Sequence, residues 1–389
     1  MTRYFSILGK GAIGILVVLS VLSAPLRAAD EDSVLSKLSN ISTISSTVPS
    51  NGDINPYGLV RIPATVGALE QGNYLVSNFN ASSNAQGTGT TIVEISPNGA
   101  LTQFAQINAG ALPGPCPGGV GLTTALAVLK TGWVIVGSLP TADGTSATAQ
   151  AGCLLVLDSG GNVVETIYGS LINGPWDMVS VDGDHQAALF VTNVLNGTVA
   201  AGGSVVNQGT VVRVNLAVSK TQMPFVESIT VVGAGFAERT DPAALVIGPT
   251  GVGISASCKR GEDSDDCWVP FHEHEAVLYV ADSLKNRITV ITDAMTRTIP
   301  DTLGRVLSSG GSLNDPLGLT VTPDGEILVV NGNDGFVTEI TPHGKQVAKT
   351  LLDSTGSPAG AGALFGILFD PQFGVVYVDD AANTLNLLH

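Results

Sequence analysis

The sequence predicts an all-β fold, a six-bladed β-propeller of four-stranded blades in which the N-terminal strand closes the last blade. Three observations predict it. Charged residues make up 13% and aromatic residues 5% of the chain, which has 47 glycines, a composition typical of short strands joined by tight turns. Six segments share one order of strands and turns, which indicates a repeat architecture. A β-rich run at residues 41–48 precedes the first repeat.

The first 29 residues are typical of an export signal. Arg3 and Lys10 precede the apolar run 12–22, and the small residues Ala28 and Ala29 come before residue 30. That run is too short to span a hydrocarbon core about 30 Å thick, which favours a cleaved signal peptide. We therefore expect residues 30–389 to form a single domain that is exported to the periplasm or the extracellular space, with no membrane span.

The charge balance excludes some partners. The formal net charge is −16, and removal of residues 1–29 takes away Arg3, Lys10 and Arg27 but no acid, which changes it to −19. A negative surface repels nucleic acid and anionic membranes and favours solubility. We expect a monomer with no nucleic-acid partner, acting on an unknown ligand or protein partner.

The repeats define the blades. Inner strands are predicted at 57–60, 124–127, 176–179, 243–246, 317–320 and 365–368. Second strands follow at 74–77, 133–137, 188–192, 277–281, 327–330 and 375–378, and third strands at 91–95, 154–157, 210–214, 287–291, 336–340 and 384–388. Outer strands follow in five repeats, but the sixth ends at His389 after three strands. Because a missing strand would leave an open edge, we expect residues 41–48 to supply it.

Residues 279–291, with the sequence YVADSLKNRITVI, carry the clearest repeat signature. Two apolar runs flank a polar turn, a pattern typical of a β-hairpin. The stretch resembles the NHL repeat, in which a YVAD strand and a polar turn precede an Arg-Ile or Arg-Val strand. This resemblance implies a propeller that serves as a recognition platform. Six-bladed relatives also include calcium-dependent lactonases of the gluconolactonase type, which hold an axial metal, and streptogramin lyases, which use His and Glu.

The four cysteines favour two disulfides in an oxidising compartment. Cys258 and Cys267 bracket a short charged insert, and Cys116 and Cys153 fall at loop–strand junctions of one repeat. We predict the pairs Cys258–Cys267 and Cys116–Cys153. A metal site of four thiolates is the alternative, although the spacing is not that of a zinc knuckle. His272 and His274 could chelate zinc or copper, or form an exposed approach to a strand.

One position in the repeat breaks its pattern. A column of small residues recurs in five inner strands: Gly58, Ala125, Ala244, Gly318 and Gly366. In the third repeat Asp177 takes this place, after Trp176, and a carboxylate there is costly unless it is paired or binds something. Polar residues also end the second strands: Asn78, Ser138, Asn193, Asp282 and Asp380. Such a ring of oxygen donors suits calcium, unless each side chain closes its own turn.

Three long loops lie on the rim that also holds the polar ring, which we call the top rim. They span 78–89, 138–152 and 193–209 and are almost uncharged, and loops of this length either bind ligands or are tolerated decoration. No nucleophile elbow, phosphate loop or HExxH motif occurs. The sequence thus favours a module that binds or scaffolds a peptide, glycan or small molecule. Its predicted contacts, at the top mouth of the axial channel, are Asp177, Trp176, Asn78, Asn193, Asp282 and Asp380. The alternative is a calcium-dependent hydrolase or lactonase with an axial site.

Overall fold

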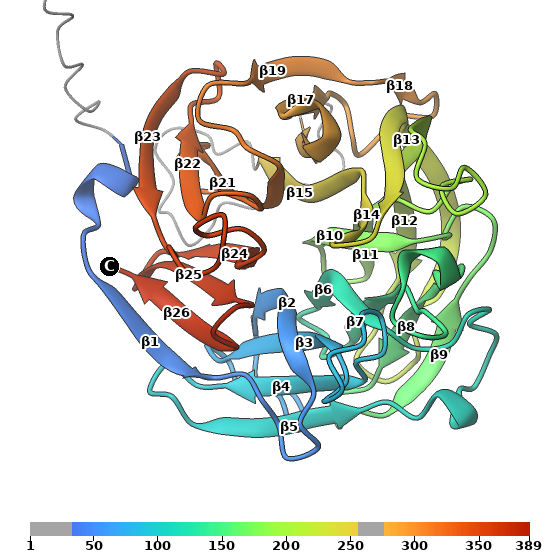
Figure 1. Cartoon of the computed structure of the whole chain (residues 1–389). Coiled ribbons are helices and arrows are strands. Elements are labelled where there is room, and N and C mark those ends of the chain that lie inside the picture. The colour runs from blue at the N-terminus through green and yellow to red at the C-terminus, as the bar shows by residue number, and fades with distance from the viewer. Residues whose placement is uncertain (1–32, 256–275) are drawn as a thin grey trace, which may run out of the picture.

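The computed structural model describes residues 33–255 and 276–389, whose strands form six antiparallel sheets in a ring around a central axis (Figure 1). The inner strands are β2 (Ile54–Arg61), β6 (Leu122–Val128), β10 (Pro175–Asp182), β15 (Pro249–Ser255), β20 (Pro316–Val321) and β24 (Leu364–Asp370). The second strands are β3 (Tyr74–Asn80), β7 (Val134–Ser138), β11 (Gln186–Asn193), β16 (Val277–Asp282), β21 (Ile327–Asn331) and β25 (Gly374–Asp379). The six-bladed propeller is confirmed.

Third and outer strands complete each blade. The third strands are β4 (Thr91–Ile95), β8 (Cys153–Leu157), β12 (Val206–Ala217), β17 (Arg287–Ile291), β22 (Phe336–Ile340) and β26 (Thr384–Leu388). The outer strands are β5 (Leu101–Gln106), β9 (Val163–Ile167), β13 (Phe225–Asp241), β19 (Arg305–Ser309), β23 (Gln346–Leu351) and β1 (Ile41–Ser46). Short 3-10 turns occur at η1 (Leu35–Lys37), η2 (Ala109–Ala111), η3 (Ser146–Thr148) and η5 (Ser283–Lys285). No helix within the two described ranges has the length and apolar character needed to cross a bilayer.

The N-terminal strand closes the ring, as predicted. Strand β1 pairs antiparallel with β26, so the last blade has its fourth strand from the other end of the chain. The residues just before β1 reach the fifth blade, where the fully buried Glu339 carboxylate accepts hydrogen bonds from Ser33 Oγ (2.7 Å) and from the N–H groups of Val34 and Leu35 (2.8 Å each). The N-terminal segment therefore ties the fifth blade to the sixth, although both lie about 300 residues further along the chain.

The predicted inner strand of the fourth blade is wrong. Residues 243–246 fall on and just before β14 (Leu245–Ile247), which pairs with the outer strand β13 of the third blade, and the inner strand is β15. In the fourth blade the small-residue column of the inner strands is therefore occupied by Gly251 and not by Ala244. The segment starting at Pro242 has the full pattern of a proline, one residue, a small residue and an apolar pair, whereas in the true strand, which starts seven residues later at Pro249, Gly253 interrupts the apolar pair.

The third blade is the most elaborate. Its strands β12 and β13 have 12 and 17 residues, and the outer strand continues through a tight turn into β14 at the top rim, near the centre of the ring (Figure 1). The short strand β18 (Asp301–Thr302), which belongs to the fourth blade's connection, pairs parallel with β13. This pairing covers part of an edge that would otherwise be open.

The same irregularity of pairing recurs where every inner strand begins. The register between inner and second strand shifts just after the first residues of all six inner strands. A bulge of this kind re-aims the side chain that it contains. The bulged residues include Tyr57, Trp176, Leu317 and Phe365, and all four are buried. The irregularity thus places large apolar side chains at the top of the axis.

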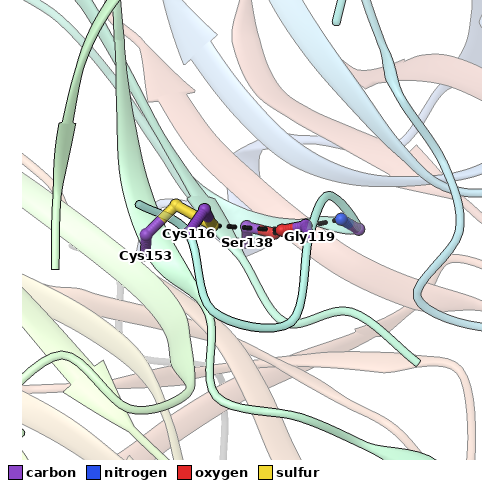
Figure 2. Close-up of a disulfide and its surroundings, with 5 residues drawn as sticks. Cys116, Gly119, Ser138 and Cys153 are labelled. Carbon is purple, nitrogen blue, oxygen red and sulfur yellow. Dashed lines mark hydrogen bonds between the residues drawn. A yellow bond between two sulfur atoms is a disulfide. The ribbon is translucent and has the colours of Figure 1, made fainter. Parts of the chain in front are cut away.

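One of the two predicted disulfides lies within the described residues and is confirmed. Cys116, in the loop before β6, is bonded to Cys153 at the start of β8, with 5.2 Å between their Cα atoms (Figure 2). Beside it, Ser138 Oγ donates to the carbonyl of Gly119 at 2.9 Å (Figure 2). The Cys258–Cys267 pair and the His272–His274 pair lie outside the described residues.

Removal of this disulfide is expected to destabilise the second blade. The bond closes a chain segment with a sequence separation of 37, and the lost loop-closure entropy corresponds to about 3–4 kcal/mol. Equilibrium denaturation of the double variant Cys116→Ala/Cys153→Ala beside the wild type measures this loss. An unchanged free energy of unfolding would show that the bond adds no stability.

Candidate functional site

The top of the axis is filled by aromatic rings from three blades. Tyr57 stacks on Phe365 with ring centroids 3.8 Å apart and on Phe79 at 4.5 Å. Trp176, which is 3% exposed, meets Tyr57 and Phe79 edge-on at 5.8 and 6.2 Å. Stacked and edge-to-face rings attract one another and bury a large apolar area. Of these rings only Trp176 was predicted as a contact, although Tyr57 and Phe365 also stand one residue before the small-residue column.

A cavity of about 290 Å³ lies along the axis below these rings, which do not line it. All six inner strands contribute to its wall, including Leu126, Asp177, Val252, Leu319 and Ile367. At the end away from the top rim it reaches Arg61, which forms an ion pair with the buried Asp370 (Nε to Oδ2 2.9 Å). The cavity therefore extends from the small-residue column toward the rim opposite the long loops. The predicted position at the top mouth of the channel is wrong, because aromatic rings fill that mouth.

Asp177 links two blades at the inner end of this cavity. Its Oδ2 accepts the N–H of Val252 in the fourth blade at 3.0 Å, and its Oδ1 accepts the N–H of Met178 at 2.8 Å. In the equivalent place of blades five and six a Cβ would lie 1.8 Å and 2.4 Å from the carbonyl oxygens of Phe365 and Tyr57. In those two blades only glycine allows the inner strand to pack directly against the next inner strand. In the third blade the Asp177 carboxylate instead bridges to the inner strand of the fourth blade.

The electrostatic state of Asp177 follows from its burial. The residue is 8% exposed, and loss of hydration raises its pKa to about 7, although the N–H groups of Met178 and Val252 lower the pKa in part. Both protonation states are thus populated near neutral pH. The carboxyl group can accept a hydrogen bond from a ligand donor or donate one to a ligand acceptor.

The polar side chains at the ends of the second strands bind mainly within the fold. Asn78 Nδ2 donates to the carbonyl of Thr47 in the N-terminal segment at 3.1 Å. Asn193 Oδ1 accepts the N–H groups of Asn173 and Gly174, at 3.1 and 3.4 Å, in the turn that leads into β10. Ser138 and Asn331 make the corresponding contacts in their blades. The position is therefore used repeatedly to hold the turn before an inner strand.

The two acids of the predicted ring have separate surroundings. Asp282 is fully buried and pairs with Arg287, whose Nη2 and Nε lie 2.6 and 2.7 Å from its Oδ2. The position predicted for Asp380 is wrong by one residue, because β25 ends at Asp379, which pairs with the residue two places before the column position of its inner strand, as Asn78 and Asn193 do. Asp380 has one buried oxygen, Oδ1, with no hydrogen-bond partner in the described parts of the chain. Burial, and then the charge of Asp379, raise the pKa of Asp380 well above its ordinary value. Burial and the charge of Asp380 together raise the pKa of Tyr57, which places Asp380 close to the axial rings.

The contacts of these acidic side chains do not suit a calcium site within the described part of the chain. Calcium takes six to eight oxygen ligands, whereas each oxygen of Asp177 accepts a backbone N–H and Asp282 is paired with a guanidinium group. No cluster of three or more His, Cys, Asp or Glu side chains suited to a metal occurs in residues 33–255 and 276–389.

The long top-rim loops pack against each other. The first and second loops are joined by Thr141, whose N–H donates to the carbonyl of Gly87 at 3.1 Å and whose Oγ1 donates to the carbonyl of Gln86 at 2.6 Å. Gln86 Nε2 donates to the carbonyl of Ala243, beside β14, at 2.8 Å. Leu139, Leu195 and Leu245 lie in the same apolar cluster as Trp176. The loops and the β13–β14 turn therefore cover the axial rings.

Comparison with solved structures shows the same fold. The structure is similar to the calcium-binding protein regucalcin from Agrobacterium tumefaciens (TM-score 0.50, 16% identity, 88% of this chain and 92% of that one). It is also similar to a putative gluconolactonase (0.50, 13%, 89% and 90%) and to virginiamycin B lyase from Staphylococcus aureus (0.48, 13%, 89% and 98%). No protein-family model matches the sequence, and no curated protein matches it. At these identities the likeness defines the fold and not the activity.

Proposed function

We propose that the chain is an exported ligand-binding propeller that holds a small ligand in its axial cavity, with Asp177 as the main polar contact. The observation that carries this proposal is a nearly buried carboxyl group on the wall of a cavity of about 290 Å³. Ligand pockets are typically apolar with a few placed polar groups, and this wall combines Asp177 with Leu126, Val252 and Leu319. The Cys116–Cys153 disulfide supports export, since such bonds persist in oxidising compartments.

The predicted site residues take different parts in this proposal. Asp177 contacts the ligand, and Trp176 belongs to the aromatic layer that closes the cavity toward the top rim. Asn78, Asn193 and Asp282 are positioning residues, because they fix the turns and strands from which the wall is built. Asp380 lies close to Tyr57 and does not line the cavity.

A thermal-shift screen of residues 30–389 against lactones, glycans and peptides tests the binding role. A ligand that raises the melting temperature of the wild type should raise it far less in Asp177→Ala. Thr192→Val is the matched control, because Thr192 accepts the N–H of Asp177 and donates to the carbonyl of Thr250 but does not line the cavity. Equal ligand shifts in the wild type and in Asp177→Ala would contradict the proposed site.

The hydrolase alternative is separated by a second assay. Hydrolysis of each lactone in the screen is followed with added calcium and with chelator. A binding propeller is expected to show ligand shifts that do not change with chelator and no calcium-dependent turnover. Turnover that requires calcium and is lost in Asp177→Ala would establish the lactonase function in its place.

A further inference from the structure

A second pocket lies on the top rim, beneath the turn between β13 and β14. It has a volume of about 410 Å³ and is built by four parts of the chain: the β13–β14 turn, the segment after β16, the segment leading into β20 and the turn after β21. Its polar lining consists of Arg239, Asp241, Ser283, Asn286, Asp315 and Asn333. None of these residues lines the axial cavity.

Two of the three charged groups in this pocket neutralise each other. Arg239 Nη2 lies 2.7 Å from Asp241 Oδ2, and Asp241 Oδ1 accepts the N–H groups of Ala243 and Ala244 at 2.8 and 3.1 Å. Burial raises the pKa of Asp241, but these hydrogen bonds and Arg239 outweigh it, so the pKa is lowered overall. Asp241 is therefore an ionised group whose charge Arg239 compensates.

Asp315 supplies a negative charge without such compensation. Its backbone is in the left-handed region (φ 57°), held by its N–H, which donates to Asn286 Oδ1 at 2.6 Å. Within residues 33–255 and 276–389, no hydrogen bond or ion pair reaches its carboxylate. Burial, and then the charge of Asp241, raise the pKa of Asp315 to about 6, and Arg239 lowers it in part. At pH 7 the pocket holds two carboxylates and one guanidinium group, a net charge of −1.

We propose that this pocket is a second binding site for a small polyhydroxylated ligand with one ammonium group, such as an amino sugar. The ammonium group would lie against Asp315, where a charge-assisted hydrogen bond is stronger than a neutral one. Asn286 and Asn333 offer amide groups to ligand hydroxyls, whereas the Ser283 hydroxyl already donates to the carbonyl of Pro316 at 2.6 Å. The volume of about 410 Å³ is at the lower end of the range for ligand pockets, which suits a single sugar ring.

Calorimetric titration of residues 30–389 at pH 7 tests this site, with glucosamine as the probe and uncharged N-acetylglucosamine as its analogue. Glucosamine is expected to bind at least tenfold more tightly than the analogue. Asp315→Asn should weaken glucosamine binding about tenfold, and asparagine tolerates the left-handed backbone at this position. Asp324→Asn, in the exposed turn after β20, makes the same change of charge on the opposite rim and should leave the affinity unchanged.

Three results would overturn the proposal. One is equal affinity for the two sugars, or no binding of glucosamine. Another is an equal loss of affinity in Asp315→Asn and Asp324→Asn, because the effect would then follow net charge alone. The third is a glucosamine affinity that is lost in Asp177→Ala but kept in Asp315→Asn, which would place the sugar in the axial cavity. A melting temperature of Asp315→Asn within a few degrees of the wild type confirms that the variant is folded.

Discussion

A chain that begins at Pro49 is expected to lose most of its folding stability relative to one that begins at Asp30. The truncation removes β1, which supplies the outer strand of the last blade. It also removes the three hydrogen-bond donors that residues 33–35 supply to the Glu339 carboxylate. A hydrogen bond to a charged group contributes about 1.5–3 kcal/mol, and an unpaired strand edge promotes aggregation. Together these losses approach the roughly 5–15 kcal/mol that stabilise a domain.

Denaturant unfolding and light scattering of the two chains measure this effect. Glu339→Ala separates the two contributions, because it removes the buried acceptor but keeps β1. Glu227→Ala, at an exposed position of β13, is its matched control and should change the free energy of unfolding by no more than about 0.5 kcal/mol. If the chain starting at Pro49 unfolds like the longer chain, the last blade does not depend on the N-terminal strand.

Stability is expected to fall as the pH rises from about 5 to 8, and Glu238 should carry much of that fall. Glu238 lies on β13, is 0% exposed, and neither of its oxygens has a hydrogen-bond partner in the described parts of the chain. Burial raises its pKa to about 8, and the nearby N–H of Asn196 lowers it in part. The folded protein therefore keeps a proton on Glu238 that the unfolded chain, with a carboxyl pKa near 4.3, has already lost.

The sign of the effect follows from this difference. Between the unfolded and the folded pKa the native state binds more protons, so each rise in pH lowers the free energy of unfolding until the folded group also ionises near pH 8. The total change is on the order of 3–5 kcal/mol. Glu238→Gln should flatten the pH dependence measured by denaturant unfolding, whereas Glu227→Gln should not. A variant Glu238→Gln with the wild-type pH profile would show that Glu238 does not titrate between these values.

The parts of the fold that the sequence predicts are those with a local repeating signal. Pro56, Pro175 and Pro316 stand two residues before a column position, and the turn after Asp282 marks a hairpin, so blades could be aligned from short segments. The predicted inner strand of the fourth blade was wrong because the segment at Pro242 matches this pattern more fully than the true strand at Pro249. The pairing of β14 with β13, which decides between the two, is a tertiary contact without a pattern of its own.

The candidate site likewise combines residues with a local sequence signal and residues defined only by tertiary contacts. Asp177 stood out because it breaks a column, and the structure places it on the wall of the axial cavity. Its bond to Val252 could not be predicted, because the fourth inner strand was misplaced. Glu238 and Asp315 carry no sequence signal, since the burial of Glu238 and the pocket around Asp315 arise from chain segments that meet only in the folded ring.

Native mass spectrometry of the protein purified from cells that express the full chain tests most directly whether this propeller holds a small ligand at its axis through Asp177. The spectrum is recorded before and after treatment with chelator, for the wild type, Asp177→Ala and Thr192→Val. We predict a bound small molecule that survives chelator in the wild type and in Thr192→Val and is absent from Asp177→Ala. A calcium adduct that chelator removes together with any bound molecule, or a bound molecule that remains in Asp177→Ala, would contradict it.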